Sequence, residues 1–246
     1  MALKKDEWIE KVARPFWKKS TELQDYQLFM RETPRAVIMD PGAFYSCADG
    51  IVLYNKIVKN AQEKVEVKGV PYSVDDIMGK DVIDGPCLIC GVFMTFADVH
   101  VNRVPYTGTI EWERLDPITT MNWSMDAQEE KIFGTKVKAG KKVKGVKNQY
   151  LYNNARVLNT FYIPEIDYKY YVVQVADFDV NSILPFATKQ KDKMLQGDRF
   201  SFVRWGSQCD VILPLRKDLK IQPLIGVDNH VEAGVDKIAS LSYNKT

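Results

Sequence analysis

The sequence predicts a β-rich α+β fold that is led by a single helix. Two observations indicate this class. The first 25 or so residues repeat apolar side chains at helical spacing, and from Phe44 onward short apolar runs alternate with Gly, Pro and Asp. A chain of 246 residues, 46% hydrophobic and 27% charged, can bury a substantial core. We expect an N-terminal helix in residues 1–29 and one domain in residues 30–246.

The N-terminal helix is predicted to be basic and amphipathic. The apolar side chains near one face are Trp8, Ile9, Val12, Phe16 and Trp17, and lysines and arginines crowd the remainder. Such a face packs on its own domain or on a partner subunit, which is the commoner outcome, or it lies on an anionic membrane surface.

Strands are predicted where apolar and β-branched residues run together. The clearest runs are "GIVLYNKIV", "PCLICGVFM", "YKYYVVQVA" and "CDVILPL". A short capped helix is expected in "YSVDDIMG", ending at Gly79. The lysine-rich stretch 136–149 is expected to be a solvated loop, with contact to anionic headgroups or phosphate as the alternative.

Composition and charge exclude several classes of function. A net charge of +2 is too small to favour nucleic acid as the main partner. No run reaches the roughly 18 apolar residues that span a bilayer. Charges throughout the N-terminus do not resemble a secretory signal, so we expect a cytoplasmic protein, with peripheral membrane attachment left open.

The cysteines do not predict a metal site. Cys87 and Cys90 form a CxxC, but no second CxxC follows and the chain has only two histidines. We expect no metal, and we expect all four cysteines, which include Cys47 and Cys209, to be buried thiols.

Three segments contain polar residues at the ends of apolar runs. In "RFSFVRWGSQCDVILP" the pair Gly206-Ser207 interrupts a strand pattern, as a β-bulge or tight turn does, or as a bend that lets the serine hydroxyl reach a carbonyl. In "FMTFADVHVNRVPYTG", His100 stands among polar neighbours before a turn. In "YSCADGIVLY", Asp49 precedes a strand. His230, in "GVDNHVEAG", is interpreted as a turn residue without a role.

Taken together, these segments resemble the short form of the phosphatidylserine decarboxylase family. The motifs ADG, FMxxxDVHVNRxPxxG and RFxxVRxGSxxDVxLP occur in this order. Additional similar stretches are "LFMRETPRAVIMDPGAFYSCADGIV", "VKGVPYSVDDIMG", "NNAR" and "IGVDNHVEAG". The likeness spans about residues 27–240 and implies the family's β-sheet core.

The resemblance implies a self-cleaving proenzyme. The Ser207 hydroxyl attacks the Gly206 carbonyl to form an ester. β-Elimination and hydrolysis then leave a covalent pyruvoyl cofactor at the new N-terminus. The products are chains 1–206 and 207–246, expected to stay together because "CDVILPL" is a core strand. Loss of CO₂ from an amino acid needs an electron sink, and a ketone joined to the substrate amine as a Schiff base provides one.

Residue roles follow from the same resemblance. His100 matches the family's decarboxylation histidine, and Asp49 matches the aspartate of self-cleavage. The second histidine of the long form is replaced by Arg103, which is not a general base. Arg103 is therefore expected to orient Asp49 or, with Asn102, to bind substrate. Gln208-Cys209 stands where the short form usually has Arg-Val, which leaves the headgroup open.

The leading hypothesis is conversion of phosphatidylserine to phosphatidylethanolamine. One alternative keeps the pyruvoyl chemistry but acts on a soluble, perhaps aromatic, amino acid. A second alternative is a non-cleaving relative that binds lipid or a partner. A homo-oligomer is compatible with all three hypotheses.

Overall fold

The computed structural model describes residues 2–17, 31, 34–67, 70–95, 97–115, 155–176, 183–187, 190–204 and 206–243. Of these residues, 52% lie in strands and 11% in helices. The predicted β-rich α+β class is therefore confirmed. The lysine-rich stretch 136–149 and residues 18–29 of the predicted helix lie outside the described residues.

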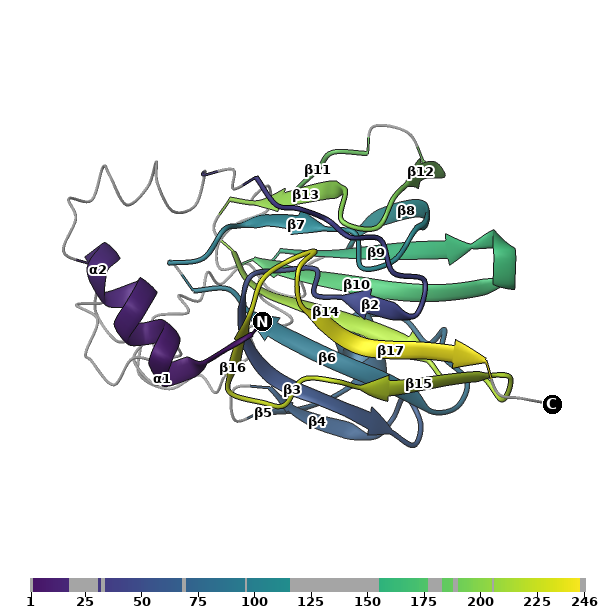
Figure 1. The fold of residues 1–246 in the computed structure, drawn as a ribbon. Coiled ribbons are helices and arrows are strands. Elements are labelled where there is room, and N and C mark those ends of the chain that lie inside the picture. The colour runs from purple at the N-terminus through teal and green to yellow at the C-terminus, as the bar shows by residue number, and fades with distance from the viewer. Residues whose placement is uncertain are drawn as a thin grey trace.

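A nine-stranded antiparallel sheet forms the centre of the molecule (Figure 1), in the order β1-β16-β3-β6-β14-β10-β9-β8-β12. Its strands are β1 (Leu3–Lys4), β3 (Gly50–Val58), β6 (Cys87–Phe93), β8 (Gly108–Leu115), β9 (Arg156–Ile163), β10 (Tyr168–Ala176), β12 (Asp192–Met194), β14 (Gly206–Pro214) and β16 (Asn229–Val231). The four strongest sequence runs are β3, β6, β10 and β14, as predicted.

Smaller sheets complete the fold. One contains β11 (Ile183–Pro185), β13 (Arg199–Val203) and β7 (Val101–Arg103), a second contains β15 (Leu219–Pro223), β17 (Lys237–Tyr243) and β2 (Ala43–Tyr45), and a hairpin joins β4 (Lys64–Val67) to β5 (Val70–Ser73). A 3-10 turn, Pro164–Ile166, connects β9 to β10.

Both faces of the central sheet are covered. Successive side chains of a strand point to opposite faces, and in β6 Leu88, Cys90 and Val92 join one core cluster while Ile89 and Phe93 join another. The first cluster packs against the two three-stranded sheets. The second packs against the N-terminal helix, the β4-β5 hairpin and α4 (Val74–Met78).

The N-terminal segment is helical from Lys5 to Trp17, as α1 (Lys5–Trp8), a π-helical stretch (Ile9–Ala13) and α2 (Arg14–Trp17). Trp8, Ile9 and Ala13 are buried in the second cluster. For these residues the helix packs on its own chain, which was the commoner of the two outcomes. In the described part of the chain, no helix has the length and apolar character needed to cross a membrane.

Helix α4 has the signals expected at both ends. The Ser73 side chain accepts a hydrogen bond from the Asp76 N–H, and the Asp76 carboxylate accepts one from the Ser73 N–H. The helix ends at Gly79, whose φ of 66° lies in the left-handed region. The predicted capped helix is confirmed.

Candidate functional site

The topology brings the three polar segments of the sequence to one end of the central sheet. Strands β3 and β14 both pair antiparallel with β6, one on each side of it. They therefore begin at the end of the sheet where β6 finishes. Asp49 directly precedes β3, the Thr95–His100 loop follows β6, and Ser207 lies at the start of β14.

The backbone at Gly206-Ser207 forms a β-bulge. Ala176 pairs with Gly206 and the preceding Val175 pairs with Gln208, so β14 advances two residues while β10 advances one. Ser207 is the extra residue, and its peptide lies outside the regular pairing. The bulge interpretation of the strand glycine is therefore correct at the level of the backbone, and it also places the proposed scissile peptide at an irregular point in the ladder.

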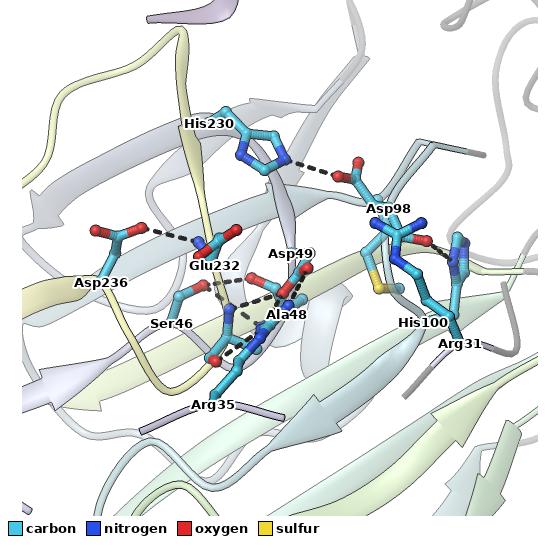
Figure 2. Close-up of polar contacts among 12 residues, drawn as sticks. Arg31, Arg35, Ser46, Ala48, Asp49, Asp98, His100, His230, Glu232 and Asp236 are labelled. Carbon is cyan, nitrogen blue, oxygen red and sulfur yellow. Dashed lines mark hydrogen bonds and ion pairs between the residues drawn. The ribbon is translucent and has the colours of Figure 1, made fainter. Parts of the chain in front are cut away.

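Asp49 is held by Arg35 in a buried ion pair (Figure 2). Arg35 Nη1 lies 2.6 Å from Asp49 Oδ1 and Nη2 lies 2.5 Å from Oδ2. The Ala233 N–H donates to Oδ1 at 2.8 Å. Burial alone would lower the pKa of Arg35, but the bond to Asp49 raises it. The Asp49 carboxylate is thus fixed in place by a cation that does not titrate near neutral pH.

The glycine after Asp49 is required by close packing. Gly50 has φ of 151°, and a Cβ at this position would lie 2.0 Å from the Phe93 carbonyl oxygen. Only glycine lets the start of β3 approach β6 this closely. The Asp-Gly dipeptide therefore places the Asp49 carboxylate beside the end of β6.

The Thr95–His100 loop is organised by Asp98. Asp98 Oδ2 accepts bonds from the Thr95 N–H and from Thr95 Oγ1, both at 2.8 Å. The His100 Nδ1 lies 2.9 Å from the Asp98 backbone oxygen. A carbonyl oxygen only accepts, so Nδ1 carries the proton and proton exchange with another group falls to Nε2.

The same loop is hydrogen-bonded to the segment that leads into the bulge strand. The Val203 N–H donates to the His100 oxygen at 3.0 Å, and Val203 lies four residues before Ser207. β7 and β13 are paired just beyond this point. His100 is fully buried at this junction.

The expectation that His230 lies in a turn is wrong. His230 lies in β16, is only 5% exposed, and its Nε2 lies 2.7 Å from Asp98 Oδ1. Trp8 stacks on its ring at 4.4 Å between centroids and 10° between planes. The local sequence resembles a turn, and the partner Asp98 is 132 residues away, so no local signal identifies the pair.

The pKa of Asp98 reflects these contacts. Burial would raise the pKa of the carboxyl, but the attraction and hydrogen bond of His230 and the bonds from Thr95 hold it below its ordinary value. Asp98 is therefore ionised at neutral pH despite its burial.

Arg103 and Asn102 have structural contacts. Arg103 Nη1 donates to the Gly197 oxygen at 2.8 Å, and the arginine that binds Asp49 is Arg35. Asn102 is fully buried, and its side-chain oxygen accepts from Gln174 Nε2 at 2.6 Å. Both residues therefore help to fix β7 within the fold.

The Gln208 side chain is held in a buried cluster with Asp210 and Tyr54. Its Nε2 lies 3.0 and 2.9 Å from the two carboxylate oxygens of Asp210 and 3.0 Å from Tyr54 Oη, and Tyr54 Oη also donates to Asp210. Gln208 is fully buried and does not line the cavity described below. An arginine at this position would meet Asp210, so the exchange to glutamine does not argue against an anionic headgroup.

A cavity of about 400 Å³ opens beside the two aspartates. It is lined by Leu3, Trp8, Val12, Arg31, Arg35, Asp49, Asp98, His230, Glu232 and Asp236. The N-terminal helix thus supplies apolar side chains to a cavity whose other walls are charged. Arg31 donates to the Ala97 oxygen at 3.2 Å, and burial lowers the pKa of its guanidinium.

The four cysteines are free thiols and all are buried, as predicted. Cys87 and Cys90 lie on opposite faces of β6, in different core clusters. Burial raises the pKa of Cys87 to about 12. Such a thiol is protonated at neutral pH and inert as a nucleophile.

Comparison with known proteins identifies the family. The sequence model described as phosphatidylserine decarboxylase matches residues 26–239. Curated relatives named "phosphatidylserine decarboxylase proenzyme" are 25% identical in Geobacter metallireducens and 27% identical in Syntrophus aciditrophicus and Xanthobacter autotrophicus. The alignments cover 79%, 65% and 76% of this chain and 69%, 62% and 63% of the relatives. No solved structure matches the chain.

The class that the strand-end site defines is thus a family of decarboxylases. This chain belongs to the phosphatidylserine decarboxylase family. It spans about two thirds of the length of these relatives.

Proposed function

We propose that this protein is a self-cleaving, pyruvoyl-dependent decarboxylase that converts phosphatidylserine to phosphatidylethanolamine. The observation that carries the proposal is the convergence of Asp49, the His100 loop and the Gly206-Ser207 bulge at one end of the sheet. Family membership and the proenzyme names of the relatives support the same assignment.

Self-cleavage is assigned to Gly206-Ser207. The bulge supports this position because a peptide outside the ladder can bend without breaking a row of sheet hydrogen bonds. A glycine before the serine leaves room for attack on its carbonyl. Once formed, the pyruvoyl group from Ser207 would supply the electron sink that loss of CO₂ requires.

His100 is assigned as the proton donor of the decarboxylation. The Asp98 carbonyl holds its Nδ1–H, so Nε2 is the nitrogen that delivers a proton to the substrate carbon. Its backbone bond to Val203 supports this role, since it ties the His100 backbone to the segment that leads to Ser207.

Asp49 is assigned an indirect role in self-cleavage, without contact to Ser207. Adjacent strands lie about 4.8 Å apart, so the starts of β3 and β14 are roughly 10 Å apart across β6. A carboxylate bound on both oxygens by Arg35 does not cross this distance. We infer that Asp49 and Arg35 shape the site around the Gly-Ser peptide.

Two measurements test the proposal. Intact mass under denaturing conditions should show one fragment ending at Gly206 and one beginning with a ketone-bearing group in place of Ser207. Release of CO₂ is then compared between phosphatidylserine vesicles and free amino acids. CO₂ from free amino acids alone would favour the soluble substrate, and an uncut chain would favour a non-cleaving relative.

Membrane contact is part of the proposal because the substrate lies in a bilayer. The exposed side of the described helix carries Glu7 and Glu10 beside Lys11 and Arg14, in i,i+4 pairs. Charge attraction from this helix alone is therefore small. Co-sedimentation with anionic vesicles at low salt should nevertheless occur, and its absence would favour a soluble substrate.

A further inference from the structure

We propose that His230 is a positioning residue that fixes the imidazole of His100 by holding Asp98. The inference rests on the proposed function for its catalytic meaning, since it assumes that His100 is the proton donor. Nothing in the local sequence around His230 indicates such a role. The contacts of its side chain do.

The first step is the pair of buried side chains. The side chains of His230 and Asp98 are 6% and 2% exposed, and Nε2 and Oδ1 are 2.7 Å apart. Removing His230 would leave a buried carboxylate without this partner. The position of Asp98 therefore depends on His230.

The second step is that Asp98 acts on the loop in two ways. Its carboxylate closes the loop onto Thr95. Its backbone oxygen receives the Nδ1–H of His100 (Figure 2). The carboxylate holds the Thr95 backbone N–H, so displacing it releases the loop whose backbone positions this carbonyl. The tautomer and ring orientation of His100 are set by this carbonyl.

The third step excludes direct participation of His230 in self-cleavage. β16 is separated from β14 by β3 and β6, so three strand spacings, about 14 Å, lie between the two backbones. Direct proton transfer requires a separation of about 3 Å or one bridging water. The side-chain hydrogen bond that links His230 to the His100 loop is the one with Asp98.

Trp8 completes the arrangement. Its indole stacks on the His230 ring, which keeps the imidazole plane fixed and its Nε2 directed at Asp98. β1, at the start of the N-terminal helix, pairs Leu3 with His230. The N-terminal segment therefore supports His100 through two residues, His230 and Asp98.

The test uses the fact that the chain has only two histidines. In protein labelled with ¹⁵N-histidine, His230→Phe leaves signals from His100 alone. Phenylalanine keeps an aromatic ring against Trp8 but donates no hydrogen bond. We expect the His100 nitrogen shifts to move from the Nδ1–H tautomer toward a mixture, with an altered titration midpoint.

Two further variants control this measurement. His230→Gln retains an N–H close to the position of Nε2, and it should return the His100 signals to the wild-type pattern. Tyr168→Phe removes a buried hydrogen bond to the Pro214 oxygen at the opposite end of the sheet, and it should leave them unchanged. Unchanged His100 signals in His230→Phe, or equal changes in Phe and Gln variants, would overturn the proposal.

The spectra are recorded on the uncut Ser207→Ala protein, so they do not depend on cleavage or on any substrate. If His230→Phe does not fold, Asp98→Asn provides the same test, and its His100 signals must differ from wild type. In the cleaved enzyme, His230→Phe should lower kcat by about 10-fold to 100-fold, with kcat restored in His230→Gln. Absence of activity in the wild type would contradict the proposed function and leave the spectroscopic result standing.

Discussion

Two buried aspartates stand at the same end of the sheet, and they have different partners. Asp49 is bound by Arg35, whose guanidinium stays charged at neutral pH, whereas Asp98 is bound by the imidazole of His230. Asp49 is also fixed by a backbone N–H of the 232–236 turn, whereas Asp98 organises a loop that ends in His100. One pair thus fixes Asp49 in place, and the other connects to the loop that carries His100.

The largest expected effects are on the reaction, where self-cleavage and decarboxylation can be separated by mutation. Ser207→Ala should remain uncut and show no decarboxylation, because no electron sink forms. His100→Ala should still be cut but should turn over about 10²-fold to 10⁴-fold more slowly, the usual cost of losing a general acid. Intact mass and CO₂ release measure the two effects. An uncut His100→Ala protein would show that His100 is needed for self-cleavage. Asp49 and the Asp98–His100 loop would then serve the same step.

Loss of the Arg35 charge should lower the free energy of unfolding more than loss of any surface ion pair. Arg35→Met leaves the Asp49 carboxylate buried without its cation, which typically lowers the free energy of unfolding by about 3–5 kcal/mol. Self-cleavage should slow as well. Urea unfolding and the rate of fragment formation measure these effects.

The matched control is Arg216→Met. Arg216 also binds an aspartate with two nitrogens, at 2.6 and 2.7 Å, but on the surface. Its removal should barely change the unfolding midpoint. Equal losses in both variants would mean that burial does not distinguish the Asp49 pair.

The stability that the His230–Asp98 pair contributes should depend on pH. In the wild type, the lowered pKa of Asp98 contributes stability above the unfolded carboxyl value of about 3.9, and this is lost as the pH falls through the folded value. In His230→Phe, burial would raise the pKa of Asp98, so stability should fall as the pH rises through it. Arg31 and Arg35 also face this carboxylate and attenuate the effect.

The measurement is the difference in unfolding free energy between the two proteins at pH 4 and at pH 7. The difference should be larger at pH 7, where Asp98 is ionised in the wild type. His230→Gln, which retains the donor, should show a smaller difference at both values. A difference independent of pH would indicate that the effect comes from packing against Trp8.

The smallest effect is expected at the buried cluster of Tyr54, Gln208 and Asp210. Tyr54→Phe removes one of the bonds to this carboxylate while Gln208 remains, so a loss of about 1–2 kcal/mol is expected. Self-cleavage should proceed at nearly the wild-type rate. A block of cleavage would mean that Asp210, three residues after Ser207, belongs to the site.

Much of the sheet could be predicted from sequence because its central strands are buried on both faces. β3, β6, β10 and β14 are long apolar runs, and α4 has a capping residue and a terminal glycine. The three-residue strands β7, β11, β12 and β16 were not predicted. They are too short for a period to emerge, and they are held by partners distant in sequence.

The site was predictable only where motifs resemble the family. Asp49, His100 and Ser207 were proposed in this way, and the structure places their segments together. Arg35 and His230 were missed as partners, since pairing depends on which strand ends meet. Arg103 was expected to orient Asp49 or to bind substrate, because it replaces the second histidine of the long form. The arginine that binds Asp49 is Arg35, from a segment before β2.

The position of the proposed cleavage bond has a consequence for the timing of activation. Residues after Ser207 supply β14 at the centre of the sheet, β16 with His230, and the Ala233 N–H that holds Asp49. A nascent chain that stopped before β14 would lack all of these groups, and one that stopped before Ala233 would still lack the N–H that holds Asp49. Maturation would then proceed only in chains whose last strands have been synthesised and inserted, so that the cut itself acts as a checkpoint on complete biosynthesis.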